Sequence, residues 1–166
     1  MRWNRYPFIL VHLNLPARHK IMVVYPASLS SFSKLFLAAS LWNLAGAILG
    51  FFNTAFTFEL IFNKELTDPL MFAVYQGAWG TTLTYFIGYL IVSRNPGRHF
   101  GVVVTGGIGK LGFIVTLLKL YSAGIAGPEI FVIVIGDGAF LGLFAYYFYR
   151  LYQSTGRHVE QRVTKL

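Results

Sequence analysis

Two charged residues of opposite sign, Lys110 and Asp137, stand inside long apolar runs of the sequence. An ionisable side chain at membrane depth is costly unless it is paired or hydrated, so such a residue marks a functional hypothesis. Counted inward from the end that the two runs share, at about 1.5 Å per residue, Asp137 lies roughly 12 Å deep and Lys110 roughly 17 Å deep. The flexible lysine stem covers this offset. The sequence therefore predicts an ion pair between two neighbouring helices.

Three roles are open for this pair. It locks two helices together, it takes part in proton or ion movement, or it holds a charged head group. Two further polar residues extend the predicted layer, because Asn43 in the first apolar run is level with Lys110 and Gln76 lies in the second run. A layer of these four residues predicts a small internal site rather than a through-going channel.

Several chemistries lack the residues that they need. The chain has no cysteine, which excludes disulfides, thiolate catalysis and cysteine-ligated metals. No bis-histidine haem site or histidine-rich metal cluster can form in the apolar runs, because all four histidines lie outside them: His12, His19, His99 and His158. The run from Gly106 to Lys110 lacks the spacing of a phosphate-binding loop. No cofactor or metal is expected, and an enzyme that works alone is disfavoured.

The elements that must position the polar layer are four apolar stretches, each near the 20 or so residues that cross a bilayer. Backbone groups in hydrocarbon must bond within their own segment, so each stretch is predicted as a helix. Polar connections separate the stretches, and Pro69 suits the first turn of the second helix. The stretches run from about Leu35 to Phe58, Leu70 to Val92, Gly101 to Tyr121 and Ile130 to Tyr152. The fold class is an all-α membrane protein with a four-transmembrane-helix bundle in residues 35–152.

Composition agrees with a lipid environment. The chain is 55% hydrophobic and 12% charged, whereas soluble domains carry about a quarter charged residues. The net charge of +8 does not indicate nucleic-acid binding, because nearly all the basic residues flank the apolar runs and form no stripe. The lipid bilayer is the expected partner, together with a homodimer or a larger membrane complex.

The same flanking charges predict the orientation. Basic residues collect in cytoplasmic connections. The N-terminal segment, the connection with Arg94 and Arg98, and the C-terminal tail are basic, whereas the other two connections hold Lys64 with three acidic residues or Glu129 alone. An N-in/C-in protein of the bacterial inner membrane is expected, with a cytoplasmic basic tail in residues 153–166.

The cytoplasmic N-terminal segment, residues 1–34, has two interpretations. It is either an amphipathic helix on an anionic leaflet or a stretch upstream of a true start at Met22. A cleavable signal that ends near Ala45-Gly46-Ala47 is a further alternative and would leave three helices. The apolar run continues beyond these residues, which favours a spanning helix instead.

Small residues form the second pattern. Gly46 with Gly50, and Gly138 with Gly142, match the GxxxG spacing, while Gly106, Gly109 and Gly112 recur every three residues in the third run. Glycine lets helix backbones approach closely. Packing within the bundle is the expected use, with homodimerisation as the alternative.

The third run, with Gly109-Lys110-Leu111-Gly112-Phe113, and the count of four spans between Leu35 and Tyr152 resemble the DoxX-like family of small bacterial inner-membrane proteins. The resemblance implies a four-helix bundle that serves as an accessory or quinone-related membrane subunit. The acidic residue expected in the glycine-rich helix is replaced by Lys110, so no family site is carried over. An accessory subunit is the leading interpretation; the alternatives are a small transporter or ion-coupled carrier and a lipid- or quinone-binding enzyme subunit.

Overall fold

Every regular element of the structure, a computed structural model that describes residues 27–163, is a helix. The expectations for residues 1–26, which concern an interfacial helix or a start at Met22, and for residues 164–166 lie outside this range. In chain order the elements are η1 (Ala27–Phe32), α1 (Ser33–Gly46), η2 (Ala47–Phe51), α2 (Thr54–Phe62), α3 (Pro69–Arg94), α4 (Phe100–Ser122) and α5 (Ile130–Val163).

Three helical segments are long and apolar enough to cross a membrane: Ser33–Phe51, which joins α1 to η2, Phe100–Ser122, and Ile130–Ser154 within α5. Helix α3 has the length, at 26 residues, but it is not among them. Its middle is more polar, since it carries Gln76 and the hydroxyls of Thr81, Thr82 and Thr84. The chain is a helical membrane-embedded protein.

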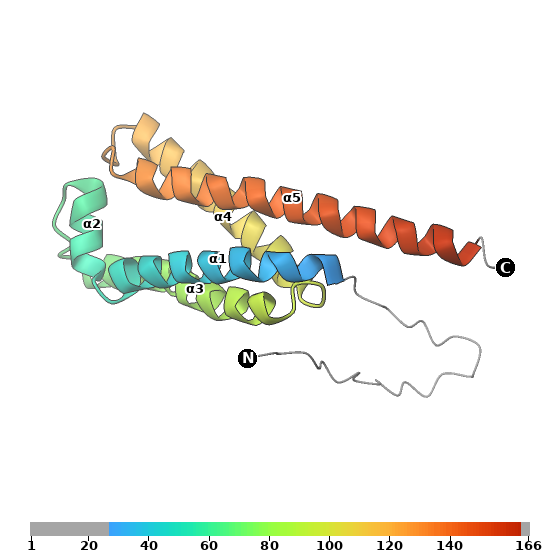
Figure 1. The fold of residues 1–166 in the computed structure, drawn as a ribbon. Coiled ribbons are helices and arrows are strands. Elements are labelled where there is room, and N and C mark those ends of the chain that lie inside the picture. The colour runs from blue at the N-terminus through green and yellow to red at the C-terminus, as the bar shows by residue number, and fades with distance from the viewer. Residues whose placement is uncertain (1–26, 164–166) are drawn as a thin grey trace.

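The helices form two antiparallel pairs, α1 beside α3 and α4 beside α5 (Figure 1). The Ser40 hydroxyl on α1 donates a hydrogen bond of 2.9 Å to the Phe86 carbonyl on α3. Successive long helices reverse direction, so the start of η1 and the end of α5 lie at the same end of the bundle (Figure 1). There the ring of Phe32 packs against the ring of Tyr147, with centroids 5.3 Å apart.

The first expected span, Leu35 to Phe58, is wrong at its C-terminal end. The helix widens into a π turn over Ala47–Phe51 and stops before Asn53, whose backbone leaves the helical region. Helix α2 then lies across the end of the bundle (Figure 1). The Gly127 amide donates to the Ile61 carbonyl of α2 at 2.7 Å, so α2 connects the first helix pair to the second.

Polar side chains make this break possible in an apolar segment. A helix end leaves backbone carbonyls without partners, and in hydrocarbon an unpartnered carbonyl is costly. The Asn53 amide donates to the Ile48 carbonyl at 2.7 Å, and the Thr57 hydroxyl donates to the Leu49 carbonyl at 2.5 Å. The Phe51 carbonyl accepts from the Gln76 amide of α3 at 3.1 Å. The break is therefore satisfied by side chains.

The start of α3 follows ordinary capping chemistry. The Asp68 carboxylate accepts from the Leu70 and Met71 amides, with Pro69 at the first helical position, as the sequence predicts. The membrane-spanning part of α5, Ile130–Ser154, ends within two residues of the expected end near Tyr152, and the helix itself continues into the predicted tail as far as Val163.

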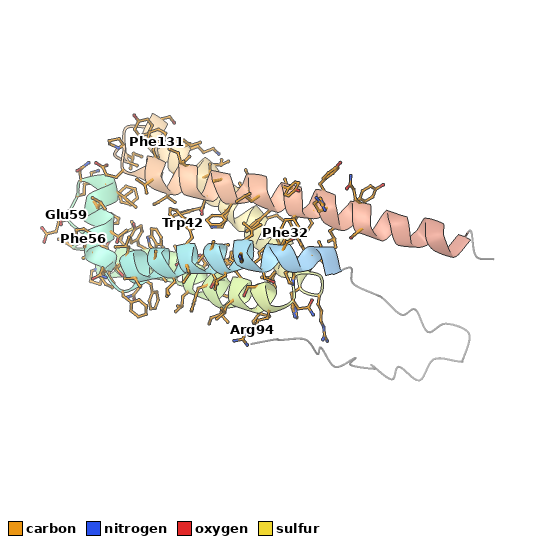
Figure 2. The ribbon with its side chains drawn as sticks, viewed as in Figure 1. Phe32, Trp42, Phe56, Glu59, Arg94 and Phe131 are labelled. Atoms are coloured by element: carbon orange, nitrogen blue, oxygen red, sulfur yellow. The ribbon has the colours of Figure 1, made fainter. Side chains whose placement is uncertain are left out.

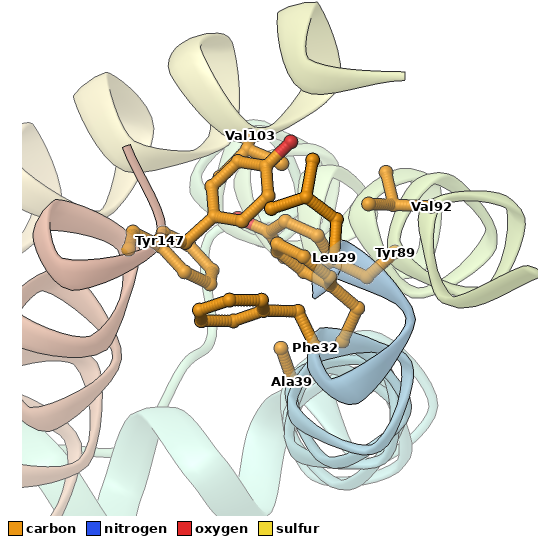
Figure 3. Close-up of a cluster of buried hydrophobic side chains, with 9 residues drawn as sticks. Leu29, Phe32, Ala39, Tyr89, Val92, Val103 and Tyr147 are labelled. Atoms are coloured by element: carbon orange, nitrogen blue, oxygen red, sulfur yellow. The ribbon is translucent and has the colours of Figure 1, made fainter. Parts of the chain in front are cut away.

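Buried apolar side chains gather at the two ends of the bundle and leave its middle less filled. Figure 3 shows the first group, in which aromatic rings from α1, α3 and α5 meet. We call it the terminal-end cluster; its buried members are Leu29, Phe32, Phe36, Ala39, Tyr89, Val92, Val103, Phe144 and Tyr147. The second group, the loop-end cluster, has Ile61, Trp79, Leu117, Ala126 and Ile130 as its buried members.

Candidate functional site

The charged pair lies between the two clusters. Lys110 on α4 donates from Nζ to Oδ1 of Asp137 on α5 at 2.5 Å, and each side chain is 7% exposed. Helices α4 and α5 are antiparallel neighbours, so residues on either side of their connection come level. The opposite charges cancel, which removes most of the cost of placing either charge in an apolar bundle.

A third residue, Trp42, joins this pair from α1. Its indole nitrogen Nε1 donates to the same oxygen, Oδ1 of Asp137, at 2.8 Å. Figure 2 shows the Trp42 side chain reaching from α1 toward α5. The approach depends on Gly136, because a β-carbon there would overlap the indole ring. The Asp137 carboxylate thereby ties together α1, α4 and α5.

The second oxygen of this carboxylate has a different environment. Among the described residues no hydrogen bond reaches Oδ2 of Asp137, while Oδ1 accepts two. The ammonium of Lys110 donates one hydrogen bond of the three that it can make, and it also lies 5.6 Å from the ring centroid of Phe140. The pair therefore retains both donor and acceptor capacity.

A cleft of about 450 Å³ reaches this pair. Helix α4 diverges from α3 along its length (Figure 1). The cleft lies between these two helices, and α1 and α5 each contribute a lining residue. Its lining residues are Asn43, Ala78, Trp79, Thr81, Thr82, Tyr85, Tyr89, Gly106, Gly109, Lys110, Phe113, Thr116 and Asp137. Of these, Ala78, Thr81, Gly109 and Thr116 are exposed. The cleft therefore opens sideways, between α3 and α4.

Both ends of the cleft are closed by buried aromatic side chains. Tyr89 belongs to the terminal-end cluster and Trp79 to the loop-end cluster, and each lines the cleft. The ring of Trp79 also packs edge-on against Phe113 of α4, with centroids 5.7 Å apart. These packed groups lie toward the two ends of the cleft, whereas its exposed lining residues lie along the side between α3 and α4.

The Tyr89 hydroxyl is the most unusual polar group of the pocket. The residue is fully buried, and its hydroxyl has no hydrogen-bond partner among the described residues. It lies against α4 at Gly106, where a β-carbon would collide with it. Buried hydroxyls without partners are rare, because they lose their hydrogen bonds to water and gain none in return. The packing against α4 closes the hydroxyl to solvent and to the cleft.

The structure brings together three of the four polar residues that the sequence singles out. Asn43, Lys110 and Asp137 all line the cleft. The Asn43 amide donates to the Ala39 carbonyl of its own helix at 2.8 Å. Gln76 does not line the cleft, because its amide is turned to the Phe51 carbonyl at the break after η2.

The glycines divide into two groups. Gly46 and Gly50 face the ring of Trp79, Gly106 faces Tyr89, and Gly109 lies 3.6 Å from the ring of Tyr85, measured from a β-carbon built on it. Nothing lies within 4 Å of a β-carbon built on Gly112, Gly138 or Gly142, so these three glycines do not face another helix within the described residues. Glycine spacing identifies a face of a helix but not which neighbour that face meets.

The sequence does not single out three residues of the site, Trp42, Tyr89 and Gly136, of which Tyr89 lines the cleft. Trp42 lies well inside the first span, whereas membrane tryptophans collect at the interfaces. This unusual depth is the feature of the sequence that could have marked Trp42 as a site residue. Tyr89 looks like an interfacial anchor, since it stands close to the end of its helix. Only the packing of α3 on α4 reveals where its hydroxyl lies.

Within residues 27–163, no group of three or more histidine, cysteine, aspartate or glutamate residues is placed to hold a metal ion. Comparisons with protein-family models, curated proteins and solved structures return no match for this chain. The DoxX-like resemblance stays a prediction, and the argument for function rests on the geometry of the cleft.

Proposed function

We propose that this chain is a four-span protein of the inner membrane, N-in/C-in, that holds a lipid-soluble molecule in the cleft between α3 and α4. Its role is that of a ligand-binding accessory subunit, not of an enzyme that works alone. The observation that carries the proposal is a sideways-opening cleft whose lining includes the ion pair of Lys110 and Asp137.

The geometry of α3 supports a fourth crossing. Its 26 residues span about 39 Å at about 1.5 Å per residue, more than the roughly 30 Å of a hydrocarbon core. Its threonine hydroxyls donate to carbonyls of their own helix: Thr81 to Ala78, Thr82 to Trp79 and Thr84 to Gly80. These side chains are therefore tolerable in lipid. Four antiparallel crossings also bring both ends of the chain to one side.

Membrane orientation follows from charge. The connection between α3 and α4, with exposed Arg94 and Arg98, lies at the same end of the bundle as the start of η1 (Figure 1). The connections at the opposite end carry Lys64 among acidic residues, and Glu129. The positive-inside rule then assigns the first end to the cytoplasm.

The size and opening of the cleft suit a ligand that comes from the bilayer. Small-molecule sites occupy about 300–1,000 Å³ and combine apolar walls with a few polar groups. Here the walls are the rings of Trp79, Tyr85 and Phe113, and the polar groups lie deeper. A molecule dissolved in the membrane reaches this opening without crossing water.

A purely structural role for the ion pair leaves one feature without a use. A pair that only locks helices together needs no cleft beside it. The second candidate function is a carrier. A carrier also needs its substrate to reach the Lys110–Asp137 pair, and the cleft provides such access. A carrier must in addition open one of the two aromatic clusters that close the ends.

Filling the cleft tests the proposal. Gly109 lines the cleft and is exposed, and a β-carbon there meets Tyr85 only at ordinary contact distance. Gly109→Phe should therefore fold and occupy the ligand volume. Gly112→Phe is the matched control, because Gly112 is exposed on the same helix outside the cleft.

The measurement is thermal unfolding of the full chain in detergent with four added probes: dioleoylglycerol, decylubiquinone, oleic acid and dioleoyl phosphatidic acid. We expect at least one probe to raise the melting temperature of the wild type and of Gly112→Phe but not of Gly109→Phe. If every probe affects the two variants alike, the cleft is not a binding site.

A further inference from the structure

The side chain of Lys110 places a nucleophile on the wall of the cleft. It lines the cleft and is 7% exposed, whereas the Tyr89 side chain is fully buried. Among the lining residues, Lys110 is the one that carries an amine. Lysine amines form imines with carbonyl compounds, and a desolvated site favours this chemistry. The cleft therefore offers a point of covalent attachment as well as a binding volume.

The carboxylate of Asp137 can move protons for this chemistry. Its Oδ1 accepts from Nζ of Lys110 and from Nε1 of Trp42, so the carboxylate is held in place beside the amine. Its Oδ2 receives no hydrogen bond from the described residues, and it is not among their fully buried unpartnered atoms, which are the hydroxyls of Tyr75 and Tyr89. Because Asp137 lines the cleft, Oδ2 is placed to exchange a proton with a group that reacts there.

The hydrogen bonding of Lys110 matches that of a protonated imine. A lysine ammonium has three donors, and among the described residues Lys110 donates one hydrogen bond, to Asp137. Its charge also lies 5.6 Å from the ring centroid of Phe140, but this contact accepts no further hydrogen bond. A protonated imine has a single N–H group. Imine formation would keep the bond to Asp137 and remove the two donors that lack an acceptor among the described residues.

The charge of the cleft is conserved by the same conversion. Lys110 and Asp137 are the charged residues of the lining, and they are bonded to each other. An ionised ligand would bring an unpaired charge into a low-dielectric site, which is strongly disfavoured. A neutral aldehyde brings none, and a protonated imine leaves one cation beside one carboxylate, as before. The lining therefore favours an aldehyde over a fatty acid or a phospholipid.

The walls of the cleft suit the apolar remainder of such a ligand. The rings of Trp79, Tyr85 and Phe113 line the cleft, and the small residues Ala78 and Gly109 lie at its exposed rim. An alkyl or polyene chain can pack against these rings and pass between α3 and α4 into the bilayer. Apolar walls also exclude water, which protects an imine from hydrolysis.

We infer that Lys110 binds a lipid-soluble aldehyde covalently, as a protonated imine with Asp137 as its counter-ion. This inference rests on the proposed function, because it names the ligand class of the same cleft. Nζ of Lys110 bonds to the carbonyl carbon, and the bond between that carbon and its oxygen breaks. Two of the three ammonium protons pass through Asp137 to the oxygen, which leaves as water. The third proton stays on the nitrogen, and nothing is oxidised or reduced.

The test incubates the full chain in phosphatidylcholine nanodiscs with hexadecanal, removes the free aldehyde, and reduces any imine with borohydride as the protein unfolds in dodecyl sulfate. Peptide mass spectrometry then locates the attached chain. Lys119 is the internal reference, because it is exposed on the same helix and does not line the cleft. We expect about tenfold more adduct at Lys110 than at Lys119, since the cleft holds the aldehyde against the amine. Equal adduct at the two lysines would overturn the inference.

Variants of the opening tie the reaction to the cleft. Gly109→Phe fills the cleft and should lower the adduct at Lys110 about tenfold, because the aldehyde is no longer held beside the amine. Gly112→Phe, whose glycine lies outside the cleft, should leave the adduct unchanged. Both variants keep Lys110 and Asp137, so the charged pair stays intact in each. The same amount of adduct in the two variants would overturn the inference.

A conjugated aldehyde, all-trans-retinal, tests the role of Asp137. A protonated imine of this aldehyde absorbs at longer wavelength than the free aldehyde or the unprotonated imine. Wild type should show the long-wavelength band, Asp137→Asn should lose it, and Asp137→Glu, which keeps a carboxylate, should retain it. Absence of the band from the wild type, or its persistence in Asp137→Asn, would overturn the inference.

The outcomes are distinguishable from those of the proposed function. A probe that stabilises the wild type but not Gly109→Phe, in a protein that forms no adduct at Lys110, would overturn the imine and leave the cleft as a binding site. If neither stabilisation nor adduct depends on Gly109, both the inference and the proposed function fail.

Discussion

The ring of Trp79 lies against the backbone of Gly50, in the volume that a side chain at position 50 would occupy. One turn earlier, a β-carbon built on Gly46 would lie 3.3 Å from the same ring. These glycines, at the end of α1 and in η2, form a seat for an aromatic side chain of α3, which lets the two segments pack closely. Because Trp79 is also a wall of the cleft, the seat on α1 positions the site.

Gly50→Ala should destabilise the protein, because its new methyl group overlaps the Trp79 ring. Overpacking of this kind costs about 1–3 kcal/mol. Gly142→Ala is the matched control: it also changes a GxxxG glycine, and nothing lies near its β-carbon, so its effect should stay within about 0.5 kcal/mol. Thermal unfolding in detergent measures both. Equal melting temperatures for the two variants would show that the seat does not hold Trp79.

Replacing one residue of the charged pair should lower the free energy of unfolding more than replacing both residues. Lys110→Met leaves Asp137 buried with only the Trp42 indole as a partner, and Asp137→Asn leaves the Lys110 ammonium without a counter-charge. Each single variant should lose about 3–5 kcal/mol of unfolding free energy, and the double variant should regain most of it. Chemical denaturation of the wild type, the two single variants and the double variant in mixed micelles gives the four unfolding free energies of a double-mutant cycle. Additive losses in the double variant would contradict an energetic coupling between the two residues.

A topology with four membrane crossings predicts which connections between helices lie on each side of the membrane. The chain has no cysteine, so single cysteines can be introduced without a background. Lys64→Cys and Ile125→Cys lie in exposed connections at one end, and Arg98→Cys lies in an exposed connection at the other. In intact spheroplasts a membrane-impermeant maleimide should label the first two, and Arg98→Cys should react only after lysis. Labelling of Arg98→Cys before lysis would remove α3 or α4 from the set of crossings.

The helical class and several helix ends follow from the sequence for physical reasons. An apolar run of sufficient length has no alternative to a helix in lipid, and Asp68-Pro69 is a strong start signal because it caps two amides and fixes the first turn. The opposite charges of Lys110 and Asp137 and their similar depth predict that they pair, because a buried ammonium has few other possible partners in lipid. The two side chains do lie in contact.

The contacts that the sequence does not predict are those that depend on which helix faces pack against each other. Asn53 and Thr57 sit in an apolar run, and their ability to satisfy the carbonyls of a π turn becomes visible only once the turn exists. The bond from Trp42 to Asp137 joins residues far apart in the chain, and Gly136 is what admits the indole. Helix periodicity contains no information about the partner of a given face.

The pairing of Lys110 with Asp137 also determines how the site responds to an energised membrane. A transmembrane voltage does about 2.3 kcal/mol of work per 100 mV on each elementary charge that crosses it. For two opposite charges that are held in contact and shift together, the two contributions cancel. Movement of the pair as a unit is therefore electrically silent, and a change of membrane potential should leave its position unchanged.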